Sequence, residues 1–129
     1  MTEYIVSLDI ITDDSLDDEA NTYLDVEDRV EKIKNITWST RSIPDGRLWR
    51  LEYAANGEQS IENIIIDLFS QLPPDLIREG LGIRDFILSI GVLTENITSS
   101  LFLSNKVLKA VSEIMPGINI ELTWYITCN

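Results

Sequence analysis

Carboxylates are the side chains in this sequence whose type and spacing could do chemistry. Three uses fit a dense group of them: a calcium site, an acid–base pair in a hydrolase, or a surface that attracts a cationic partner. The 129-residue chain has no histidine, so Ser-His-Asp and Cys-His catalysis and histidine-ligated metals are excluded. The carboxylates are concentrated within sixteen residues, at Asp13, Asp14, Asp17, Asp18, Glu19, Asp25, Glu27 and Asp28. We call residues 13–28 the acidic segment.

The acidic segment does not match a calcium-binding loop. A loop that began at Asp13 would place Ser15 and Asp17 at its third and fifth positions. Its sixth position, where glycine makes the sharp turn, is Asp18, and its twelfth, where a bidentate glutamate belongs, is Leu24. We therefore expect no metal site.

Carboxylate catalysis and cofactor binding are also disfavoured. A glycoside hydrolase needs two carboxyl groups that face each other across a pocket, one of them with a raised pKa, and a surface cluster is the wrong environment. Gly80 and Gly82 begin like a dinucleotide-binding fingerprint, but Asp85 stands where the third glycine belongs, and a strand rather than a helix follows. We expect no catalytic residue and no cofactor.

Charge narrows the class of partner. Asp and Glu number 22 against 10 Lys and Arg, which gives a net charge of −12, and residues 1–31 hold eleven acids and one base. Nucleic acids and anionic membranes are therefore excluded as partners, because both are negatively charged. Two interpretations of the acidic segment remain: a solvated face that aids solubility, or a surface for a basic partner. Arg41, Arg47 and Arg50 flank a turn, and they could pair with the acidic segment or contact carboxylates of a partner.

Several features favour a cytoplasmic protein. Cys128 is the lone cysteine, so no internal disulfide can form. The first residues lack the positive region and apolar run of a secretory signal, and no apolar run approaches the ~20 residues that span a bilayer.

Periodicity in the first half predicts a strand, a helix and a hairpin. Tyr4–Ile11 alternates and predicts a strand, and a short helix with Leu16, Ala20, Tyr23 and Leu24 on one face is expected after Ser15. Residues 31–40 favour an extended form, and residues 48–54 resume it after the turn signal at Pro44, Asp45 and Gly46. We expect these two strands to form a hairpin joined by more than two residues.

The second half predicts two helices and two strands. Residues 61–72 carry a helical apolar stripe, which Ser60 caps and Pro73 and Pro74 end. Residues 86–94 are apolar on both faces, which is typical of a strand inside a sheet, and residues 101–103 could form a short strand. Ser104 would cap a third helix, and a last strand would follow. The inward side chains are expected to be Val107, Leu108, Val111, Ile114 and Met115 on that helix, and Ile118, Ile120, Leu122, Trp124 and Ile126 on that strand.

These elements predict one α+β domain over residues 1–129. The expected order is β-α-β-β-α-β-(β)-α-β, a largely antiparallel sheet with about three helices packed on one face. Most of the aromatic side chains are expected in the core, with Trp38 and Tyr125 as candidates for a wet, partner-facing position.

The ordered motifs resemble a known family. A start of the form Tyr4-x-x-x-Leu8-x-Ile10, an acidic turn from Asp13 to Glu19, and Arg47-Leu48-Trp49-Arg50-Leu51 entering a strand are similar to a bacterial family of domains of unknown function. Members of that family often lie beside toxin genes as immunity proteins. The resemblance implies an antitoxin role in interbacterial competition, such as contact-dependent growth inhibition, and carries over no catalytic residue.

The expected function is therefore an immunity protein that binds and neutralises a cognate, basic, nuclease-type toxin domain. The predicted partner-binding residues are Asp13, Asp14, Asp17, Asp18, Glu19, Asp25, Glu27, Asp28 and Arg47. The alternative is an acidic mimic of nucleic acid, or a regulatory protein, that acts on a housekeeping enzyme; a small carboxylate hydrolase ranks third. The oligomeric state stays open, with a slight preference for a monomer.

Overall fold

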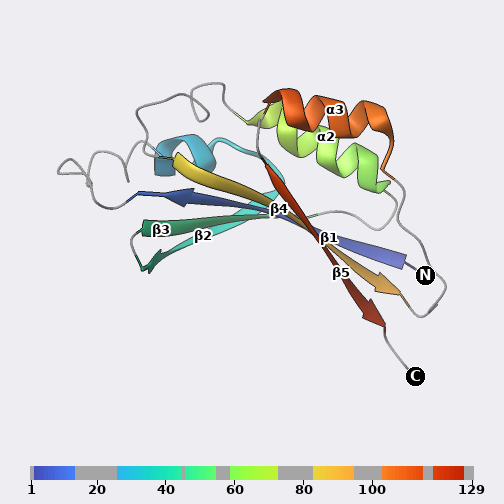
Figure 1. Ribbon diagram of the computed structural model, residues 1–129, viewed down its shortest axis with the longest axis horizontal. Helices are drawn as coiled ribbons and strands as arrows, with labels where there is room; N and C mark the ends of the chain where they lie inside the picture. The colour runs from blue at the N-terminus through green and yellow to red at the C-terminus, as the bar shows by residue number, and fades with distance from the viewer. Residues whose placement is uncertain are drawn as a thin grey trace.

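The chain builds a five-stranded sheet in the order β2-β3-β1-β4-β5 (Figure 1). The computed structural model describes residues 2–13, 26–44, 46–54, 59–72, 83–94, 103–114 and 118–126. The strands are β1 (Thr2–Thr12), β2 (Ile36–Ile43), β3 (Gly46–Tyr53), β4 (Ile83–Thr94) and β5 (Asn119–Ile126). Residues 26–31 are helical, and the helices α2 (Ile61–Gln71) and α3 (Asn105–Ile114) follow later in the chain.

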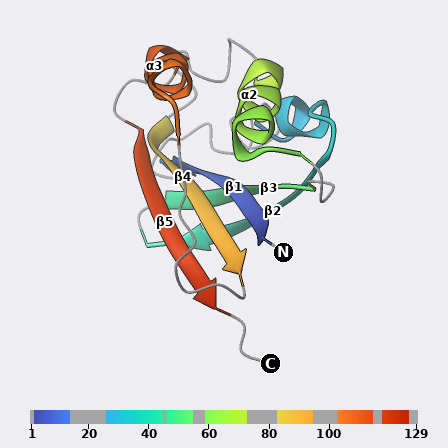
Figure 2. The same cartoon turned by 90° about the vertical axis from the view of Figure 1, so that its right-hand side faces the viewer.

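The predicted fold class is confirmed. Three of the four strand pairings are antiparallel and only β4 and β5 run parallel. All three described helices lie on one face of the sheet (Figure 2). Three predicted features fall wholly or partly outside the described residues: the helix over residues 15–24, the end of the second helix at Pro73 and the short strand at residues 101–103, of which Leu103 is described and not in a strand.

Alternation along β1 separates the two faces of the sheet. Val6, Leu8 and Ile10 point to the helices and are at most 1% exposed, whereas Ile5 on the opposite parity is 40% exposed. β1 is central, so its apolar row continues on both sides: Leu8 lies between Leu51 of β3 and Leu88 of β4. This shared row is the core onto which the helices pack.

The stripe on α2 closes the core as predicted. The Ser60 hydroxyl accepts the Asn63 amide as N-cap, and the buried side chains are Ile61, Ile64, Ile65, Leu68 and Phe69. On the same helix Asp67 accepts a hydrogen bond from the hydroxyl of Tyr53, which joins α2 to β3.

Ser104 caps α3 as expected, since its hydroxyl accepts the Val107 amide. Its own amide donates to Glu62 of α2 at 2.8 Å, which holds the two helices together and lowers the pKa of Glu62.

The extended form expected from residue 31 is wrong for residues 31–35. Val26, Val30 and Ile33 are buried at helical spacing, and the helix over residues 26–31 runs into a turn before β2 begins. Asn35 adopts a positive φ of 66° in that turn, a conformation that asparagine tolerates. Gln71 of α2 fixes the turn by donating to the Lys34 carbonyl and accepting the Lys34 amide.

The hairpin loop is also shorter than expected. The register pairs Ile43 with Gly46, so two residues rather than more connect β2 and β3. Gly46 is the first residue of β3, and its backbone passes close to β1. A Cβ atom at this position would lie 2.5 Å from the Thr12 carbonyl oxygen. Only glycine fits at that approach.

Burial at the far side of the sheet differs from the prediction. Val107 and Val111 of α3 are buried, but Leu108 is 37% exposed. Ile120 and Leu122 of β5 are 38% and 50% exposed, although both point to the helix side of the sheet. The reason is topological: β5 is the edge strand, so apolar side chains on it lack the neighbours that cover β1 and β4.

Two isoleucines of α2 provide a matched test of this core. Ile64→Ala should lower the free energy of unfolding by about 2–5 kcal/mol, because it deletes a side chain that is 1% exposed. Ile66→Ala, two residues on and 48% exposed, should change it by less than about 1 kcal/mol. Urea denaturation followed by circular dichroism measures both, and equal losses would contradict the assigned helix face.

Tyr53 predicts a pH dependence at the alkaline end. Burial, and then the hydrogen bond to Asp67, raise the pKa of Tyr53 above its ordinary value of 10.0. The protonated phenol therefore stabilises the fold fully below pH 10, and this contribution is lost as the pH rises through the raised pKa. Tyr53→Phe should unfold at lower denaturant concentration near neutrality and show a shallower loss of stability above pH 10. An unchanged alkaline slope would contradict the assignment.

Candidate partner-binding surface

The structure describes four of the nine predicted partner-binding residues. Asp13, Glu27, Asp28 and Arg47 are described, and Asp14, Asp17, Asp18, Glu19 and Asp25 lie outside the described residues. Asp13 follows the last residue of β1, and Thr12 pairs with Arg47 in the neighbouring strand. The start of the acidic segment and the β2–β3 hairpin therefore lie at the same end of the sheet.

Two of the described candidates, Asp28 and Arg47, differ in their surroundings. Asp28 on the helix over residues 26–31 forms an ion pair with Lys32 at 3.2 Å, with both side chains about 70% exposed. An exposed pair of this kind contributes less than about 0.5 kcal/mol, so it leaves the carboxylate available to solvent. Arg47 donates to the hydroxyls of Thr40 and Ser42 at 3.4 and 3.2 Å, which fixes its guanidinium along the hairpin.

The sheet face opposite the helices, which we call the open face, carries an ion pair that was not predicted. Arg50 of β3 donates from Nε and Nη2 to the two carboxylate oxygens of Asp9 in β1, at 2.9 and 3.0 Å. Asp9 is almost fully buried, whereas the side chain of Arg50 is half exposed. The hydrogen bond and the charge of Asp9 raise the pKa of Arg50. Arg50 thus pairs with a strand residue rather than with the acidic segment.

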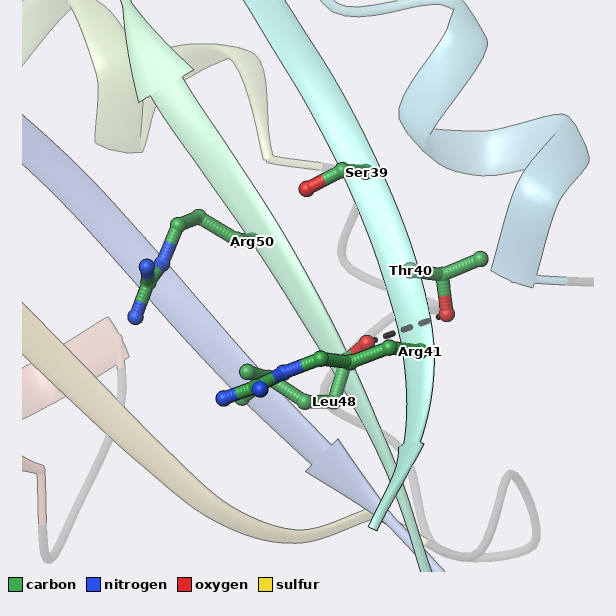
Figure 3. A pocket seen from close by; sticks show the side chains of 5 residues that line it. All are labelled: Ser39, Thr40, Arg41, Leu48 and Arg50. Atoms are coloured by element: carbon green, nitrogen blue, oxygen red, sulfur yellow. Dashed lines mark hydrogen bonds between the residues drawn. The ribbon is translucent and has the colours of Figure 1, made fainter.

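A hollow of about 380 Å³ lies beside this ion pair (Figure 3). Ser39, Arg41, Leu48 and Arg50 are among the residues that line it. In Figure 3 the side chain of Arg41 extends from β2 across Leu48, and Arg50 extends from β3 toward β1. The charge of Arg50 is neutralised by Asp9, so among the described lining residues Arg41 supplies the positive charge of the hollow. A planar guanidinium can form two parallel hydrogen bonds with a carboxylate.

The far side of the open face exposes two large apolar side chains, Tyr125 and Ile5. Tyr125 of β5 is 51% exposed and its ring lies over Gly91 of β4, where a Cβ atom would be 3.1 Å from the ring. Ile5 of β1 flanks the same glycine from the other side. The expectation of a wet position for Tyr125 is confirmed, whereas Trp38 packs on the core with its ring 5.9 Å from that of Trp49.

The described residues contain no group of three or more acidic or cysteine side chains placed to hold a metal ion. Within the same ranges no helix is long and apolar enough to cross a bilayer.

The sequence contains only a weak indication that Asp9 and Arg50 form an ion pair. Each is a charged residue at an outward position of an alternating strand, at Asp9 between Leu8 and Ile10 and at Arg50 between Trp49 and Leu51. The pairing of β1 with β3, forty residues apart in the chain, is what makes them neighbours. Local spacing carries no information on that pairing.

Comparison with known proteins gives one structural likeness. A scan of protein-family models and a search of curated proteins return no match. The crystal structure of MupZ from Pseudomonas fluorescens aligns over 98% of this chain and 93% of its own, with a TM-score of 0.49 and 7% sequence identity. A likeness at this level supports no conclusion about function.

The Asp9–Arg50 pair can be tested by a double-mutant cycle. Arg50→Ala should lower the free energy of unfolding by about 1–2 kcal/mol, because it leaves a buried carboxylate uncompensated while the arginine itself is half in solvent. Arg41→Ala, the matched control on the neighbouring strand, should cost less than about 0.5 kcal/mol. The double variant Asp9→Asn with Arg50→Ala should lose less free energy of unfolding than the sum of the losses of the two single variants. Strictly additive losses would contradict the pair.

Proposed function

We propose that this protein is a cytoplasmic immunity protein, which binds and neutralises a basic toxin domain without transforming a substrate. One observation carries the proposal: residues 1–31 hold eleven acids and one base, which is nearly all of the chain's net charge of −12. Such a concentration accelerates association with a cationic partner and repels nucleic acid. A basic nuclease-type domain is the partner that this charge suits best.

The contact surface we propose is the acidic segment together with the end of the β2–β3 hairpin. The segment leaves the sheet at Asp13, the residue after Thr12, and Thr12 pairs with Arg47 in the strand register. The β1–β3 pairing holds one end of the segment, and Val26 and Val30, which are buried in the core, hold the other. Anchoring limits the ordering that binding must impose, which strengthens binding. The Arg41 hollow near the hairpin offers a site for a carboxylate of the same partner.

The test is charge reversal with a matched control. The proposal predicts a toxin gene beside the gene for this protein, and the partner to assay is the basic domain at the end of that toxin, purified and also expressed in cells. Changing Asp13, Asp14, Asp17 and Asp18 to Lys should slow association at low salt at least tenfold and remove protection from growth arrest. The control changes four exposed acids elsewhere, Glu3, Glu52, Glu113 and Glu121, to Lys.

Both variants shift the net charge from −12 to −4. A difference in association rate or protection between them is therefore due to the position of the changed residues and not to the overall charge. We expect the control to retain protection. Equal effects of the two variants would contradict the proposed surface. Hydrolysis of a substrate by the purified wild-type protein would contradict the proposed class of function.

A further inference from the structure

The outer strand β5 is exposed on both of its faces, with apolar side chains on the helix side and with Tyr125 among polar side chains on the open face. Leu122 and Ile120 are 50% and 38% exposed on the helix side, and Tyr125 is 51% exposed on the open face. β5 lies at the edge of the sheet, with β4 on one side and no described strand on the other. Within the described residues, no strand pairs with the outer backbone groups of β5.

β5 lacks the features that normally protect an edge strand. Native edges are kept from pairing by shortness, proline, bulges or charged side chains. β5 is eight residues long, contains no proline, and has Glu121 as its one charged residue. The register with β4 runs without a shift from Asn119 to Ile126, so no bulge twists the edge away.

We propose that β5 pairs antiparallel with β5 of a second copy of this chain, which joins the two sheets about a two-fold axis. The sequence of the strand is self-complementary when the axis passes at Leu122. In that register Leu122 lies opposite its own counterpart, and Glu121 lies opposite Thr123 of the second copy. Apolar side chains meet apolar ones on one face, and no carboxylate faces another carboxylate across the axis.

The distribution of charge permits this pairing despite the net charge of −12. The proposed axis at Leu122 is level with Ile90 of β4 and, through β4, with Val6 of β1, whereas the acidic segment begins beyond Thr12 at the far end of β1. The helix over residues 26–31 lies beside α2 on the side away from α3 and β5 (Figure 2). Charges separated by much more than about 8 Å are largely screened at physiological salt. The proposed β5 contact uses no residue of the acidic segment, so it is independent of the proposed function.

The oligomeric state of the full chain tests the proposal. Light scattering after size exclusion, with sedimentation equilibrium over a range of protein concentrations, should give a mass of about twice 14.7 kDa. Leu122→Asp should weaken the dimer at least tenfold. Ile66→Asp is the matched control, because Ile66 is 48% exposed on α2 and the charge change is identical. A monomer at every concentration, or equal effects of the two variants, would overturn the proposal.

The register has its own test at Thr123. Thr123→Lys places a cation opposite Glu121 and should tighten the dimer, whereas Thr123→Glu places a second carboxylate there and should loosen it. The two dissociation constants should differ by roughly tenfold or more, because the two-fold axis repeats the pair. Ile66→Lys and Ile66→Glu correct for the change in net charge. Equal dissociation constants for the two Thr123 variants after this correction would overturn the Leu122-centred pairing.

Discussion

Burial of one apolar sheet face beneath a single layer of helices is the interaction on which the rest of this structure depends. Leu8, Leu51 and Leu88 form a continuous row across three strands, and each is at most 1% exposed. A side chain of this size contributes about 1.5–3 kcal/mol when it is fully buried. The α2 stripe covers that row, so the helix side of the sheet is dry along it, and no described helix covers the open face.

Charge is arranged around that core in two ways. On the open face Asp9 and Arg50 neutralise each other across β1 and β3, which lets a carboxylate lie in an almost fully buried position. The excess of acid is concentrated instead in the segment that leaves β1 beyond Thr12. Carboxylates crowded in one segment repel one another and lower stability, which is a cost that selection would retain for a function in binding.

The elements that could be predicted from sequence are those with strong local periodicity. The α2 stripe, the alternation of β1 and the Ser60 and Ser104 caps depend on residues within one or two turns of each other. The helix over residues 26–31 was missed because its apolar residues, Val26 and Val30, are embedded in charged sequence next to a stretch that favours strands. Alternation also predicted a buried face for β5, since periodicity does not distinguish an edge strand from a central one.

The candidate site was less predictable than the fold. The acidic segment is visible in composition alone, but the Asp9–Arg50 pair and the Arg41 hollow require the register between strands distant in the chain. Likewise, the exposure of Tyr125 beside Ile5 depends on the parallel pairing of β5 with β4. Long-range pairing is the information that local patterns lack.

The central claim is that a concentrated negative charge draws this protein to a cationic toxin domain. The most direct measurement is the association rate constant of the wild-type protein with the basic toxin domain that the proposal predicts, over salt concentrations from about 10 mM to about 500 mM. The account predicts a rate that falls steeply with salt, while the dissociation rate changes little. An association rate that does not depend on salt would contradict it.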